Sequence, residues 1–165
     1  MQNVHPLVVH FPIALLVLAV AAEWVSAVRG HPTLETIARW SLYLGTIAAA
    51  LAAISGWYAA QTVTEVAAAH DSIAHHQRLG FLTLGTAAVL AFWRFGSAAR
   101  GGPRPRWLFR LGVLGLGAFL LWTAEEGGEL VYEYGVGTEL TAPEGPLAEP
   151  PSDSGRSGPT GDEFR

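Results

Sequence analysis

Four long apolar segments restrict what this chain can fold into. They run from about Leu7 to Val28, Ala38 to Ala60, Ile73 to Phe95 and Trp107 to Ala124. An apolar helix of about 20 residues is long enough to cross the hydrocarbon core of a bilayer. The helices of a soluble bundle carry a polar stripe, whereas IAAALAAI (47–54) and LGVLGLGAFLL (111–121) have none. We therefore predict an all-α protein, a bundle of four transmembrane helices in contact with the lipid bilayer.

The first segment has one alternative interpretation, a cleaved signal peptide, because Ala19-Val20-Ala21 resembles a cleavage site. A signal peptide begins with positive charge, and residues 1–9 contain no Lys or Arg. We therefore expect the segment to remain as the first span.

Arginine placement predicts the orientation. The connections between spans one and two and between spans three and four, with their flanks, carry seven of the ten Arg residues, and Arg78 is the only other one before residue 138. Positive charge in short loops stays on the cytoplasmic side. We therefore predict a multi-pass protein of the cell inner membrane with both termini outside.

Composition separates a membrane domain, residues 1–137, from an acidic tail, residues 138–165. The tail has six acids against two Arg and is rich in Pro, Gly and Ser, whereas the preceding residues are electrically neutral. Such a segment buries too little apolar surface to fold, so we predict a disordered extracytoplasmic tail.

Cysteine is absent, which excludes disulfides, iron–sulfur clusters and thiolate metal sites. A basic face is also missing, so we expect no nucleic-acid partner.

Most histidines and acids of the membrane domain fall on the predicted outer side. The set comprises His5 and His10 in span one, His70, Asp71, His75 and His76 at span three, and Glu125, Glu126, Glu129 and Glu133 at span four. Imidazole and carboxylate groups together suit zinc, copper or iron, and two imidazoles from different helices suit haem b. The sequence contains no H-E-x-x-H or other compact metal motif.

Helical geometry narrows the candidate ligands. His5 and His10 lie about 140° apart on a straight helix, so they converge only if Pro6 and Pro12 deform it. His75 and His76 are adjacent, and at most one of them is expected to face the bundle. We predict that His10, His75 and His76 bind a cofactor, and that the metal ligands come from His5, His10, His76, Glu125 and Glu129.

The sharpest expectation is that His10 and Glu125 share one site. Either a metal bridges them, or they form a direct hydrogen bond that orients the imidazole.

Other polar and aromatic residues have simpler interpretations. His70 is expected to be an interfacial loop residue, and the glutamates near Glu125 are a solvated helix end if no cation binds. The tryptophans are expected to anchor the interface, and Glu23 to pair with Arg39 or Arg94 or to reach the interface.

Two terminal motifs resemble a known family. HPLVVHFPIALL (5–16) and GGELVYEYGVG (127–137), with SGW (55–57) and HHQRLG (75–80), are similar to the small bacterial membrane proteins called domain of unknown function 2231. The resemblance covers residues 4–137. It implies a four-helix membrane domain, sometimes accompanied by iron–sulfur or cytochrome components, with no established reaction. Relatives often carry His where this chain has Glu125, a departure that disfavours haem and favours a harder or borderline metal.

Two functions follow as hypotheses. The first is an outer-face metal or haem site that serves electron transfer or metal handling, beside a redox or other membrane complex. The alternative is a cofactor-free structural or assembly subunit. The sequence shows no nucleophile–base pair and no cofactor fingerprint, so an enzyme is the least favoured class.

Overall fold

Four helices make up the described part of the chain in a computed structural model, which describes residues 5–62, 70–100 and 106–133. They are α1 (His5–Arg29), α2 (Pro32–Thr62), α3 (His70–Arg100) and α4 (Arg106–Tyr132). All four are long and apolar enough to cross a membrane, which confirms the predicted fold class. The predicted tail, residues 138–165, lies outside the described residues.

The helices extend beyond the apolar segments because polar turns continue them. α2 begins six residues before the predicted Ala38, with Pro32 at its first position, where the missing N–H has no helical partner to lose. The turn before it is set by Gly30, whose φ of 63° is a left-handed conformation that favours glycine at a helix end. α1 is continuous from His5 and keeps Pro12 inside it. The helix is therefore unbroken between His5 and His10.

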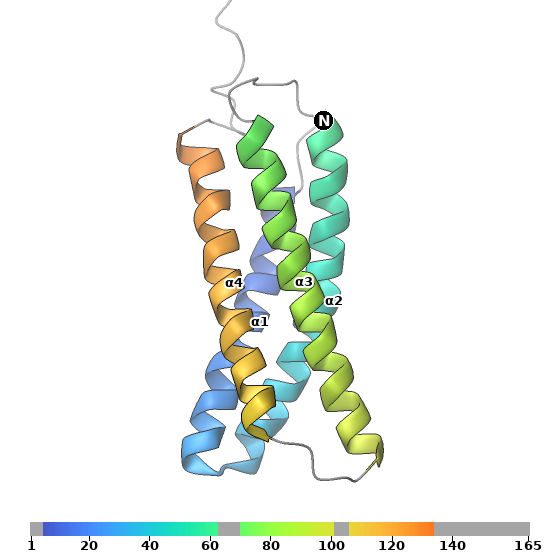
Figure 1. Cartoon of the computed structure of the whole chain (residues 1–165), viewed down its shortest axis with the longest axis vertical. Helices are drawn as coiled ribbons and strands as arrows, with labels where there is room; N and C mark the ends of the chain where they lie inside the picture. Colours follow the sequence, from blue (N-terminus) through green and yellow to red (C-terminus); the bar gives the residue numbers. More distant parts are fainter. Residues whose placement is uncertain (1–4, 63–69, 101–105, 134–165) are drawn as a thin grey trace, which may run out of the picture.

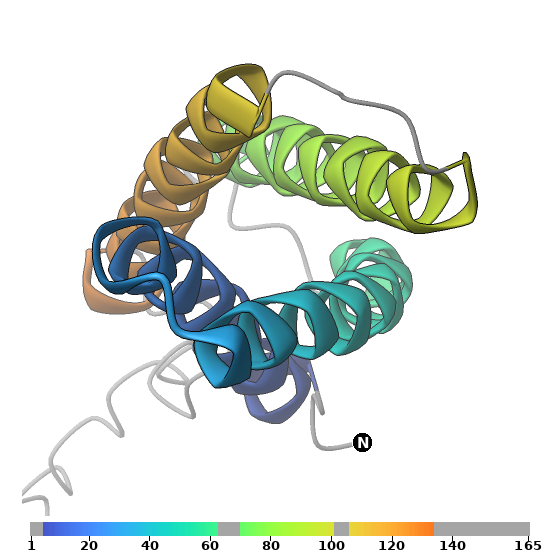
Figure 2. The same ribbon diagram turned by 90° about the horizontal axis from the view of Figure 1, so that it is seen from below.

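The helices form a ring in chain order, each antiparallel to the one before, and α4 closes against α1 (Figures 1 and 2). α1 and α3 therefore lie diagonally across the bundle. α1 and α3 begin at the same end as α2 and α4 finish, and we call this the histidine end. The opposite end, which carries most of the arginines, is called the arginine end.

The middle of the bundle is a compact apolar core. Leu16 and Leu116 are fully buried at its centre, and Gly45 lets α2 approach α1, since a Cβ there would lie 2.7 Å from Leu16 Cδ2. The outward faces are also apolar, with Ile47, Phe92 and Leu121 more than 60% exposed. An apolar exterior around an apolar core is what a lipid-embedded bundle requires.

Candidate functional site

His5, at the start of α1, is held against α2 at the histidine end. Its Nδ1 lies 2.9 Å from Ser55 Oγ, and the Ser55 hydroxyl donates its hydrogen to the Ala52 carbonyl at 2.9 Å. Ser55 Oγ therefore accepts from His5 Nδ1–H, because a hydroxyl has a single hydrogen to give. This tautomer places the lone pair of the ring on Nε2. The contact is close because α2 has Gly56 there, whose added Cβ would lie 2.7 Å from His5 Cε1.

His76 of α3 occupies a matching position against α4. Its Cε1 would lie 3.0 Å from a Cβ added to Gly127. His76 Nδ1 is buried and has no hydrogen-bond partner in the part of the chain that the structure describes. Burial lowers the pKa of His5, and the electrostatic influence of His76 lowers it further. His76 therefore acts on His5 from the diagonal helix, and each ring lies against a glycine of the helix beside it.

His75 points to a different place from His76, as expected for adjacent helical residues. Its Nδ1 lies 3.0 Å from Glu126 Oε1, and its ring packs edge-on against Trp122 with centroids 5.9 Å apart. Both partners belong to α4, so the His75–Glu126 contact joins α3 to α4. The Glu126 side chain is only 18% exposed. Glu126 is among the acids that the sequence places at this end, but it is not one of the predicted ligands.

The remaining predicted site residues are exposed. His10 of α1 and Glu125 and Glu129 of α4 have exposed side chains. His70, which was predicted to lie in a loop, is instead the first residue of α3 and is also exposed. Within residues 5–62, 70–100 and 106–133, no three His, Asp or Glu side chains are grouped closely enough to hold a metal ion. The site shared by His10 and Glu125 stays a prediction. The structure instead shows His5 held by Ser55 of α2, with His76 acting on it electrostatically.

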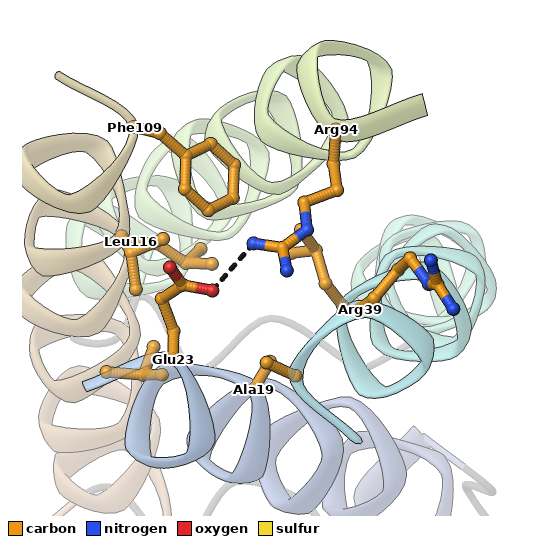
Figure 3. Close-up of a pocket in the computed structure, with 10 residues that line it drawn as sticks. Ala19, Glu23, Arg39, Arg94, Phe109 and Leu116 are labelled. Carbon is orange, nitrogen blue, oxygen red and sulfur yellow. Dashed lines mark hydrogen bonds and ion pairs between the residues drawn. The ribbon is translucent and has the colours of Figure 1, made fainter. Parts of the chain in front are cut away.

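A second polar group lies at the arginine end. Glu23 Oε2 lies 2.7 Å from Arg94 Nη1 (Figure 3). Arg110 Nε lies 3.8 Å from Glu23 Oε1. The Arg94 guanidinium also sits over the Phe109 ring, 5.2 Å from its centroid. Of the two partners predicted for Glu23, Arg94 is the one it contacts. Arg39 lines the same small pocket with its guanidinium turned away from Glu23 (Figure 3).

The fold defines the class: a membrane protein with four apolar helices, whose outward faces contact lipid. A family model described as "Predicted membrane protein (DUF2231)" matches residues 1–140. The chain belongs to this family, which confirms the resemblance of its terminal motifs. A search of curated proteins and a search of solved structures each returned no match.

Proposed function

We propose that this chain is an inner-membrane protein, with both termini outside, that binds a transition metal ion or haem b at its histidine end. In this role it serves electron transfer or metal handling beside a larger membrane complex. The observation that carries the proposal is a pair of partly buried imidazoles at the histidine end, His5 and His76, of which His76 acts electrostatically on His5. The arginine distribution of the sequence supports placing this end on the outer side.

The arrangement of His5 suits a metal ligand. Metal-binding histidines usually donate their second ring N–H to a fixed acceptor, which sets the tautomer and the ring orientation. Ser55 is that acceptor for His5, and the lone pair is then on Nε2. The buried Nδ1 of His76, which has no hydrogen-bond partner among the described residues, offers a second nitrogen. Imidazole nitrogens suit zinc, copper and iron.

A bare ion is the preferred form of the cofactor. It needs only two imidazole nitrogens and one or two further ligands, for which His10, Glu125 and Glu129 remain the candidates from sequence and water is the simplest. Haem b would also require a flat slot between α1 and α3, and Glu125 stands where relatives often carry His.

The second candidate function is a cofactor-free structural or assembly subunit. It is favoured by the absence of a three-ligand group in the described part of the chain. The His5–Ser55 contact fastens α1 to α2, and the His75–Glu126 contact fastens α3 to α4. In this alternative the histidines only hold the helix ends.

Metal analysis and a visible absorption spectrum of protein purified from membranes separate the two. The metal site predicts that His5→Ala and His76→Ala each abolish bound metal or haem, while His31→Ala, in the turn before α2, retains it. Loss only in His10→Ala and Glu125→Ala would instead place the ligands where the sequence alone puts them. A protein that stays empty after incubation with zinc, copper, iron and haem would be the structural subunit.

A further inference from the structure

The pocket at the arginine end has more positive charge than its buried carboxylate neutralises. It is lined by residues of all four helices, among them Glu23, Arg39 and Arg94, and Arg110 adjoins Glu23. Three guanidinium groups against one carboxylate leave two positive charges. Arg39 has no hydrogen-bond or ion-pair partner among the described residues. Excess charge near the hydrocarbon is unfavourable unless an anion balances it.

Arg110 has a donor that nothing satisfies. Its Nε is buried and has no hydrogen-bond partner within the described segments, because 3.8 Å to Glu23 Oε1 exceeds hydrogen-bond distance. Arg94 is better satisfied, since Nη1 donates to Glu23 and Nη2 lies 3.5 Å from the Glu35 carbonyl. Because an unmet buried donor is destabilising, the pocket lacks an acceptor on the Arg110 side.

The surroundings of the pocket fit the depth of lipid headgroups. Trp40 near the start of α2 and Trp107 at the start of α4 are 55% and 64% exposed, as expected for side chains in the interfacial belt. Beyond the guanidinium groups the pocket is narrow, and its walls are apolar, with Val20, Leu42 and Val113. A polar ligand therefore has room only at the mouth, among the arginines.

We propose that Arg39 and Arg94 of this pocket, with the adjoining Arg110, bind a phosphate group such as the headgroup of an anionic phospholipid. The planar guanidinium fork matches phosphate oxygens and donates two hydrogen bonds to them at once. Basic pockets between transmembrane helices bind anionic lipid headgroups in the same way. When the partly exposed Arg110 side chain turns outward, a phosphate oxygen accepts from its Nε, and the other oxygens meet Arg39. This site does not depend on a metal at the histidine end.

Binding to full-length protein in detergent micelles tests the proposal. The probes are phosphatidylglycerol, phosphatidylcholine and inorganic phosphate, with bound lipid counted by native mass spectrometry and Tm recorded. Phosphatidylglycerol should bind and raise Tm more than phosphatidylcholine. Arg39→Gln and Arg110→Gln should each weaken this binding about fivefold. Arg29→Gln removes an equal charge at the same end but outside the pocket, and should leave binding unchanged.

The remaining outcomes identify the source of the phosphate or overturn the site. Selective binding of phosphatidylglycerol, with no competition from inorganic phosphate, supports a lipid ligand. Competition by inorganic phosphate supports the same site with a free phosphate ligand. Glu23→Gln should tighten binding, because it removes the carboxylate that competes for the guanidinium groups. Equal binding of phosphatidylcholine, or equal weakening by Arg29→Gln and Arg39→Gln, would show only a general attraction to the surface and defeat the proposal.

Discussion

Glu23 of α1 and Arg94 of α3 form an ion pair across the diagonal of the bundle, with Oε2 and Nη1 2.7 Å apart. Their side chains are 11% and 21% exposed. α1 and α3 are not neighbours in the ring (Figure 2), so this contact links two helices that do not pack side by side.

Removing one partner of this pair should be strongly destabilising. Glu23→Ala leaves the Arg94 guanidinium without its carboxylate, which costs about 3 kcal/mol or more. Arg94→Ala should cost less, because Arg110 Nε remains 3.8 Å from Glu23 Oε1. The double variant should lose less than the sum of the single variants, because neither charge is then left alone. Unfolding in mixed detergents, followed by circular dichroism, measures the difference. Equal losses for Arg94→Ala and for the exposed Arg29→Ala would show that the pair contributes nothing specific.

The glycines beneath the two histidines should not tolerate a methyl group. In Gly56→Ala the new Cβ would lie 2.7 Å from His5 Cε1, so the ring must move, at a cost of about 1–3 kcal/mol. Gly127→Ala, at 3.0 Å from His76 Cε1, should cost less. Gly128→Ala is the matched control, because nothing lies within 4 Å of its Cβ position and alanine favours a helix. Thermal unfolding of the three variants tests this order, and a Gly128→Ala protein as unstable as Gly56→Ala would refute it.

The membrane fold could be predicted from the sequence because the length of an apolar segment can be read directly along the chain. The helix limits were less predictable: Pro32 to Ile37 and His70 to Ser72 are helical although they lie outside the apolar segments. Polar turns at a membrane interface remain helical because water and neighbouring helices satisfy their backbone groups.

The arrangement of the histidine end could be predicted only in part. The sequence predicted that the histidines and acids lie near the same end of the bundle. Which of them face inward depends on contacts with helices that are distant in the sequence. His5 packs against α2 because Ser55 hydrogen-bonds its ring and Gly56 leaves room for it, whereas His10 is exposed. Glu125 and Glu126 differ by about 100° around α4, and only contact with His75 distinguishes them.

Stability should fall as the pH drops below the ordinary pKa of histidine, partly through His5. Burial, and then His76, lower the pKa of His5 from its usual 6.5. The unfolded chain therefore takes up a proton at a pH where folded His5 stays neutral. The stability contributed by neutral His5 is fully present above about pH 6.5 and is lost as the pH falls toward the lowered pKa of folded His5. His5→Gln keeps a polar side chain but does not titrate, so its unfolding free energy should depend less on pH between 7 and 5 than that of the wild type. Identical pH profiles would exclude His5 as a contributor.

The acidic tail should be dispensable for folding, since residues 138–165 contain few large apolar side chains beyond Leu140, Leu147 and Phe164. A chain truncated after Gly137 should insert into membranes and melt at the same temperature as the full chain. A large fall in Tm would mean that the tail packs on the membrane domain.

The orientation can be tested directly because the chain has no cysteine. Gly145→Cys places one thiol in the tail, and Gly102→Cys places one in the arginine-rich connection between α3 and α4. If positive charge keeps the arginine end in the cytoplasm, a membrane-impermeant maleimide added to intact cells should label Cys at position 145 and miss position 102. Permeabilised cells, in which both positions should react, control for buried thiols. The reverse pattern would move His5 and His76 to the cytoplasmic side, and the proposed outer-face metal site would then have to be abandoned.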